Sequence, residues 1–295
     1  MTTEEKLSWY QKSNFFVYKN LLVVSLAEFC NFFAFSSTQS LQSSLNAERG
    51  FISLCVLYVF CAVCLLFLPK LLIACIGFKF SIALAIFGYT IYQMIQFHPA
   101  TGMMIFGAIS VGFSGSVFWV AVPSPITVLA RQHSQHTGKD FEMTNQKFYA
   151  MYYFLFRFSL VPSNLLLSSI LKHNDRKVNY HTNSTLQMNL QCGIKACPTL
   201  TSTLSHVNIK DAHRLFWIYL EVGLSGVPII LLFFSNIKEQ KDNQEEDVWV
   251  VVKDNLVAVL KIFREMWILE LFIISMAQGM VQSFIIGDMT KVRLF

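Results

Sequence analysis

Residues 34–58 read AFSSTQSLQSSLNAERGFISLCVLY, and this stretch closes one apolar run and opens the next. Its first half is rich in serine, threonine, glutamine and asparagine and carries almost no charge. If these side chains faced lipid, each would leave hydrogen-bonding groups unsatisfied at a cost of several kcal/mol. We therefore expect this helix end to face other helices, a water-filled cavity or the far membrane surface. The alternative is that these residues only mark where a first membrane helix leaves the bilayer.

The composition outside this stretch is that of a membrane protein. The hydrophobic fraction is 54%, charged residues make up 14%, and the mean hydropathy is +0.48. A soluble domain has about 25% charged residues. Several apolar runs exceed the length that indicates a spanning helix. The fold class predicted is therefore an all-α, polytopic membrane helix bundle. The net charge of +5 fits basic loops at a membrane face and requires no nucleic-acid partner.

The hydropathy pattern predicts seven membrane helices. Their approximate bounds are 21–41, 50–68, 80–97, 102–129, 148–171, 215–234 and 267–286. Pro69 is expected to end the second helix, and Pro123 and Pro125 are expected to break the end of the fourth. The fourth helix also contains small residues that let neighbouring helices approach closely in lipid, namely Gly107, Gly112 and Gly115.

The distribution of lysine and arginine predicts the orientation. Eight of them lie in the amino-terminal segment and the short loops of one side, whereas the opposite short loops hold Arg49 alone. Basic loops stay in the cytoplasm, so the amino terminus is predicted to be cytoplasmic. The chain then divides into a cytoplasmic amino terminus (1–20), a six-helix membrane half-bundle (21–234) with a lumenal loop (172–214), a cytoplasmic linker (235–266), and a seventh helix with a truncated end (267–295).

The lumenal loop carries two candidate modification sites. Asn183-Ser184-Thr185 is a glycosylation sequon. Cys192 and Cys197 stand in the sequence CGIKACP, where they would form a disulfide in an oxidising lumen. A zinc site is the other option, but no histidine pairs with them nearby in sequence, so the disulfide is favoured.

Four ionisable residues fall within the predicted helices, namely Glu28, Arg157, Glu221 and Glu270. Such residues are expensive in lipid and usually face a bundle interior or a cavity. Glu270 is near a helix end, where its side chain can reach the interface. Glu28 and Arg157 lie roughly 10–14 Å deep from the same side, at a rise of ~1.5 Å per residue. Because the two side chains lie at a similar depth in the membrane, they can pair with each other. The pair would be either a structural ion pair or part of a proton or substrate relay. Glu221 enters from the opposite face.

Gln39 and Gln42 are three residues apart, so on a helix they share a face with Ser36 and Ser43. If the first helix borders a central cavity, this face would bind a solute. In an accessory protein the same face would pack against a partner. The sequence leaves both options open.

No motif argues for an enzyme or a cofactor. The sequence has no phosphate-binding glycine loop, nucleophile elbow or zincin motif. The spacing of His133 and His136 favours a solvated loop over a metal site. Residues 248–267 alternate apolar and charged side chains at helical spacing. They predict an amphipathic helix that lies on the cytoplasmic membrane surface or packs against the base of the bundle.

A family resemblance runs through most of the chain. It is carried by residues 39–46, 53–54, 68–69, 76–79, 138–140, 145–146 and 168–169, and by Tyr58, Trp119, Phe148, Cys192, Gly193, Cys197, Gly279, Gln282, Phe284, Asp288, Thr290 and Lys291. With these residues the sequence resembles the uncoordinated-93 (Unc-93-like) family of the major facilitator superfamily. The resemblance implies the amino-terminal six-helix half of a facilitator fold, followed by a truncated seventh helix. The family has twelve helices in two halves, so the chain resembles a short isoform or an incomplete gene model.

The resemblance also implies a function. Relatives regulate two-pore potassium channels, or carry nucleic-acid-sensing Toll-like receptors from the endoplasmic reticulum to endolysosomes. An accessory subunit of a channel or a receptor-trafficking factor, in the plasma membrane or an endomembrane, is the function implied. The alternative is a secondary transporter of a small solute or proton, inactive here because the second half is missing. A non-functional fragment is the third option.

Three departures from the family pattern argue against a standard transport cycle. Arg157 stands where a neutral residue is usual, and residues 161–164 read VPSN where Trp-Gly-Asn is expected. The charged signature of sugar facilitators between the second and third helices is missing as well.

Overall fold

The computed structural model describes residues 3–45, 47–178, 209–237, 250, 253, 257–259, 261–262 and 264–284. Within these residues the regular secondary structure is α-helical throughout, which confirms the predicted all-α membrane bundle. Asn183, Cys192 and Cys197 lie outside the described residues. So does the side chain of Gln42, although its backbone belongs to the first helix.

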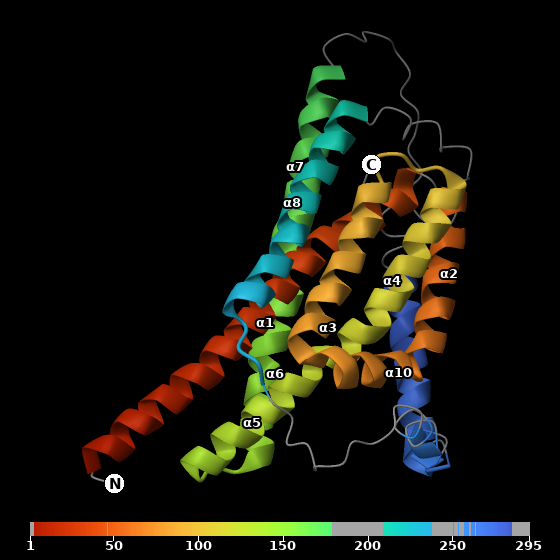
Figure 1. Ribbon diagram of the computed structural model, residues 1–295. Coiled ribbons are helices and arrows are strands. Elements are labelled where there is room, and N and C mark those ends of the chain that lie inside the picture. The colour runs from red at the N-terminus through yellow and green to blue at the C-terminus, as the bar shows by residue number, and fades with distance from the viewer. Residues whose placement is uncertain are drawn as a thin grey trace.

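The described helices follow one another along the chain as shown in Figure 1. They are α1 (Thr3–Leu45), α2 (Ala47–Leu65), α3 (Leu68–Ile95), α4 (Thr101–Ala121), α5 (Pro123–Thr137), α6 (Phe141–Phe158), α7 (Leu160–Val178), α8 (Ile209–Phe233) and α10 (Met266–Phe284).

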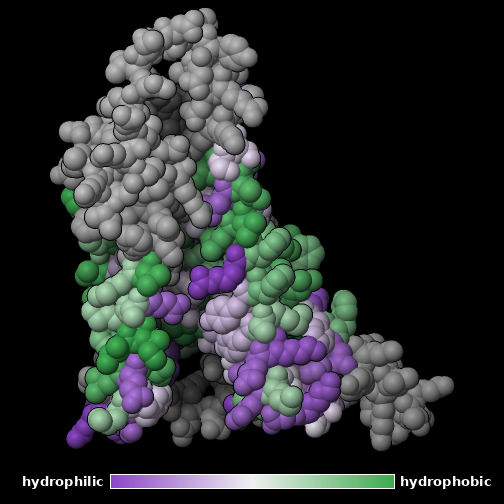
Figure 2. Space-filling model, turned by 180° about the vertical axis from the view of Figure 1, so that it is seen from behind, coloured by the Kyte–Doolittle hydropathy of each residue, from purple (hydrophilic) through white to green (hydrophobic). Residues whose placement is uncertain are grey.

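Each of the seven predicted spans corresponds to an apolar helical segment. Five segments are long and apolar enough to cross a membrane: Asn14–Gln39, Leu68–Ile95, Thr101–Thr137, Phe141–Ile170 and Ala212–Phe233. The predicted second and seventh spans correspond to shorter apolar helices, Ile52–Leu65 and Met266–Val281. Figure 2 shows hydrophobic side chains along the middle of one face, and hydrophilic ones gathered at the end where α5 meets α6 in Figure 1.

α1 begins at Thr3, well before the predicted start near residue 21, and runs for 43 residues. It lies against α8 along much of its length and also contacts α5, α6 and α7. Two polar residues of its first half have partners at the end of α8. Lys19 Nζ donates to Ser235 Oγ (3.0 Å), and the Ser235 backbone N–H donates to Asn20 Oδ1 (2.8 Å). These bonds satisfy polar groups in the segment that joins the polar amino terminus to the apolar span.

The prolines begin helices where the sequence predicted that they end or break them. α2 ends at Leu65, and Pro69 occupies the first turn of α3. The break expected at Pro123 is present, but a further helix, α5, starts there. A proline suits the first turn of a helix because the backbone N–H groups of that turn make no hydrogen bond within the helix. The proline ring also fixes φ close to the helical value. The predicted loop before residue 80 is therefore the first part of α3, which bends at Gly77 (φ 77°, ψ 172°).

α5 and α6 form a tight helical hairpin. Gly138 takes the left-handed conformation (φ 66°) after α5, and its N–H donates to the Ser134 carbonyl (2.9 Å). The side chain of Asp140 then accepts from the Met143 N–H (3.0 Å) and caps α6. These are the usual devices that end one helix and start the next. They give residues 138–140, which carry part of the family resemblance, a structural role.

His133 corrects one prediction. It lies in α5, buried, and not on a solvated loop, because α5 continues the helix past Pro123. Its ring centroid is 5.5 Å from those of both Tyr18 and Phe148. In the described part of the chain, no group of three histidine, cysteine, aspartate or glutamate residues could hold a metal ion.

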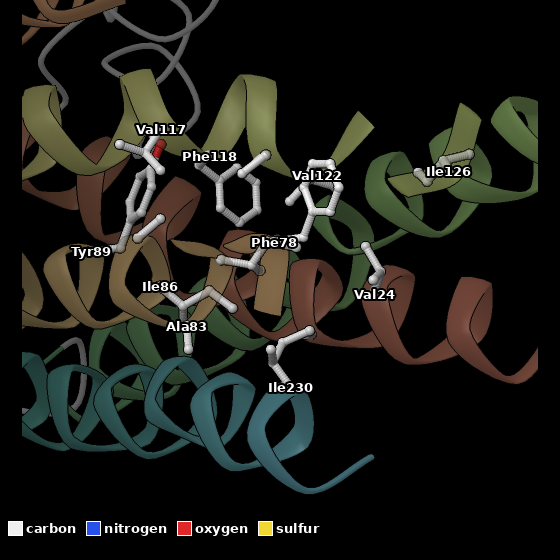
Figure 3. Packing of buried hydrophobic residues seen from close by; sticks show 14 of the residues in the cluster. Val24, Phe78, Ala83, Ile86, Tyr89, Val117, Phe118, Val122, Ile126 and Ile230 are labelled. Atoms are coloured by element: carbon white, nitrogen blue, oxygen red, sulfur yellow. The ribbon is translucent and has the colours of Figure 1, made fainter. Parts of the chain in front are cut away.

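The core lies between α1, α3, α4 and α8. In Figure 3, Ile86 and Tyr89 of α3, Phe118 of α4 and Ile230 of α8 lie around this interior. Glycines bring α2 and α4 close together, as the sequence predicted. A Cβ at Gly112 would lie 2.9 Å from the Leu57 carbonyl oxygen of α2. In lipid, such close packing is the main source of helix–helix stability.

The segments after α8 are described only in part. Residues 250, 253, 257–259 and 261–262 are helical. Most of the apolar face of the predicted amphipathic helix lies outside the described residues, so that helix stays a prediction. α10 buries none of its described side chains against the rest of the described chain; Ile268 alone is half-buried.

Candidate functional site

α1 places Glu28 and Asn31 in the bundle interior, where they are 1% and 0% exposed. They are three residues apart and so neighbours on the helix surface. Within the described chain, neither Glu28 carboxylate oxygen and neither atom of the Asn31 amide has a hydrogen bond of ordinary geometry. Buried polar groups are normally paired, since each unpaired one costs about 1–3 kcal/mol. These two residues are therefore the strongest site candidates in the described chain.

Tyrosines of two other helices lie near the Glu28 carboxylate. The Tyr152 hydroxyl of α6 interacts with it, without reaching ordinary hydrogen-bond geometry. Tyr89 of α3 and Tyr153 of α6 are close enough to interact with its charge. We call Glu28, Asn31 and Tyr152 the Glu28 centre.

Aromatic rings close the site one helical turn further along α1. The Phe32 ring centroid lies 4.7 Å from that of Phe156, 5.6 Å from that of Trp119, 5.8 Å from that of Phe118 and 6.0 Å from that of Tyr89. α1, α3, α4 and α6 all contribute to this wall. The Glu28 centre is thus a small polar island in apolar surroundings, where a charged carboxylate needs a counter-charge.

The structure does not bring Arg157 to Glu28. Arg157 is exposed, and its guanidinium carbon lies 5.2 Å from the Phe156 ring centroid. The reason is rotational: Arg157 follows Tyr152 by five residues, which places it about 140° around the helix. Arg157, which the sequence places at the same membrane depth as Glu28, therefore points away from it. Glu221 and Glu270 are exposed as well, on α8 and α10.

The polar stretch at the end of α1 is buried against α7 and α8. Ser37 and Ser163 share a hydrogen bond, and the Ser163 hydroxyl also bonds the Phe33 carbonyl. The Tyr219 hydroxyl donates to the Ser163 carbonyl (3.3 Å). Gln39 is buried, at 5% exposure. For the described part of this face, packing between helices explains the polar residues.

Sequence reasoning missed Asn31, Tyr152 and Gln93. Gln93 is 1% exposed, and neither atom of its amide has a hydrogen bond within the described chain. Gly223 of α8 leaves room for it, since a Cβ there would lie 2.6 Å from Gln93 Oε1. For Asn31 and Gln93 the available signal was an amide inside an apolar run, because such a side chain, like a charge, usually faces a bundle interior or a cavity.

Comparison with known proteins gives consistent matches. A family model described as "Ion channel regulatory protein UNC-93" matches residues 41–290. Protein unc-93 homolog A of Danio rerio is 30% identical over 285 residues, covering 92% of this chain and 59% of the relative. The Homo sapiens protein of the same name is 27% identical over 280 residues, covering 92% and 60%.

A third match adds a more specific description. The putative potassium channel regulatory protein unc-93 of Caenorhabditis elegans is 29% identical over 154 residues, covering 52% of this chain and 22% of the relative. The chain spans about 60% of the length of the curated unc-93 homolog A proteins that it matches. Glu28 and Asn31 precede the region that the family model matches.

Proposed function

Because the chain belongs to the UNC-93 family of ion channel regulatory proteins, we propose that it is a multi-pass accessory subunit that regulates an ion channel. The name of the Caenorhabditis elegans relative makes potassium channels the proposed class of partner. Two-pore potassium channels are the proposed type, and the amino terminus is proposed to be cytoplasmic. Regulation of a channel by an accessory subunit requires a surface inside the membrane that binds another protein, and it does not require catalysis.

The observation that carries the proposal is a face of the span formed by α6 and α7 that the described part of the chain leaves exposed. Only 17% of its apolar stretch is buried, against 61% for the spans Asn14–Gln39 and Thr101–Thr137. Polar side chains are exposed along it, including Arg157, Asn164 and Ser168. An arginine that faces lipid is costly, at about 2.5–3.5 kcal/mol or more near the bilayer centre. A protein partner that covers this face and offers Arg157 an acceptor would remove that cost.

Arg157 is the residue through which this contact is tested. We expect Arg157→Glu to reduce the amount of a two-pore potassium channel that co-purifies with the chain by about tenfold, which corresponds to ~1.4 kcal/mol. Potassium current density in cells that express both proteins should change with the wild-type chain and return toward the channel-alone value with the variant.

Arg131→Glu is the matched control. Arg131 is also exposed, with its guanidinium carbon 5.6 Å from the Phe141 ring centroid, but it lies on α5 and not on the face of α6 and α7. It should retain full co-purification and full effect on the current. Equal loss with both variants, or no effect of the wild-type chain on any channel current, would contradict the proposal.

The second candidate is a secondary transporter, and the Glu28 centre is what favours it. A carboxylate buried among membrane helices often marks an ion or proton pathway. Transporter sites, however, lie between two repeats that alternate around them. We therefore expect the purified chain in sealed vesicles to show no saturable uptake under a proton gradient. Uptake that Gln39→Ala and Gln42→Ala abolish would instead favour the transporter.

A further inference from the structure

We propose that Glu28, Asn31 and Tyr152 bind one monovalent metal cation, sodium or potassium, in the interior of the helix bundle. The inference is independent of the channel partner, because it concerns a buried site and not the face of α6 and α7. It also concerns residues outside the region that the family model matches, since that region begins at residue 41.

The ligand atoms are of one chemical kind. Glu28 offers two carboxylate oxygens, Asn31 one amide oxygen and Tyr152 one phenol oxygen. Hard cations prefer such oxygen ligands from carboxylates and side-chain amides. Both Glu28 oxygens and the Asn31 amide have no ordinary hydrogen bond within the described chain, so no other contact shown there competes for them.

The geometry lets one ion reach all three side chains. Glu28 and Asn31 are three residues apart on α1, so their Cβ atoms are about 5–6 Å apart. Tyr152 approaches the carboxylate from α6, a different helix. A cation between them would link α1 to α6 at a point where the described chain provides no ordinary hydrogen bond to Glu28.

The charge balance selects a monovalent ion. The centre contains one carboxylate, and Arg157 is turned away from it. A single positive charge makes the buried site neutral, whereas a divalent ion would leave one uncompensated positive charge in apolar surroundings. No group of three acidic, histidine or cysteine residues among the described side chains suits zinc or another divalent metal.

The experiment measures the thermal unfolding midpoint of the purified chain in detergent or nanodiscs. NaCl or KCl is raised against N-methyl-D-glucamine chloride at constant ionic strength and fixed pH, and the series is repeated at a second pH. A ligand that binds the folded state raises the midpoint saturably. We expect a saturable rise with sodium, potassium or both. Glu28→Gln should abolish the rise, and Asn31→Ala and Tyr152→Phe should raise the half-saturating concentration about tenfold.

Glu221→Gln is the matched control, because it makes the same chemical change at an exposed glutamate and should keep the full response. A midpoint that is equal in sodium, potassium and N-methyl-D-glucamine overturns the proposal; if it still changes with pH, the occupant is a proton. Loss of the response in Glu221→Gln also overturns it. If Glu28→Gln does not fold, the other two variants decide. A half-saturating cation concentration that is the same in Asn31→Ala and Tyr152→Phe as in the wild-type chain also overturns the proposal.

Discussion

Single residues within the membrane differ mainly in which way they point. Glu28 and Arg157 satisfy the same sequence criterion, a charge inside an apolar run, yet Glu28 is 1% exposed and Arg157 is exposed. The difference follows from the rotation of α1 and α6 about their axes. The tyrosines that lie near the Glu28 carboxylate are Tyr152, Tyr89 and Tyr153, and they come from two other helices.

Gly112 allows a prediction at this scale. Gly112→Ala should lower the stability of the folded chain by about 1–3 kcal/mol, because the new methyl group meets backbone atoms of α2 that cannot move aside. A Cβ there would lie 2.9 Å from the Leu57 oxygen and 3.1 Å from the Cys61 nitrogen. The thermal unfolding midpoint of the purified chain checks this.

Gly102→Ala is the control on the same helix, since a Cβ there meets nothing within 4 Å. It should leave the midpoint unchanged. If the two variants unfold at the same temperature, the close approach of α2 and α4 does not govern stability.

Helices in this chain are delimited less by their hydropathy than by their local backbone chemistry. α1 begins at Thr3, well before its apolar run, and Lys19 and Asn20 have partners at Ser235. Pro69 and Pro123 start helices because their geometry suits a first turn. Neither effect shows in a hydropathy profile, so the predicted boundaries were least accurate at these places.

The bend in α3 gives a prediction at the scale of the element. Gly77 has φ 77° and ψ 172°, a region that essentially only glycine populates. Gly77→Ala should therefore cost about 1–3 kcal/mol or straighten α3. Gly138→Ala should cost less, about 1 kcal/mol, because the left-handed conformation at φ 66° is accessible to other residues.

Chemical denaturation of the purified variants, followed by tryptophan fluorescence, compares the two losses. A Gly138→Ala variant that is as unstable as Gly77→Ala, or less stable, would show that the bend at Gly77 is not a strained position for alanine.

Orientation across the membrane belongs to the whole molecule, and the glycosylation sequon tests it. With the amino terminus in the cytoplasm, the segment between α7 and α8 is lumenal, and Asn183 should be glycosylated. Asn183→Gln and Thr185→Ala should each remove the resulting gel shift. Ser184→Ala should keep it, because the middle position of the sequon accepts most residues. A tag beside Asn183 that is accessible from the cytosol of intact cells would show the opposite topology. The pairing of Cys192 with Cys197 stays a prediction.

The sequence by itself determined the membrane class, the seven apolar segments, the family and the close packing around Gly112. Each of these depends on properties that a residue or a short stretch carries with it: hydropathy, size, or a pattern shared with relatives. Only the tertiary structure decided that Glu28 is buried beside Tyr152 while Arg157 and Glu221 face outward, and that His133 packs against Tyr18 and Phe148. The physical reason is that these outcomes depend on how helices far apart in sequence rotate and pack against one another. A periodic pattern shows which residues share a face, but the neighbouring helices decide where that face points.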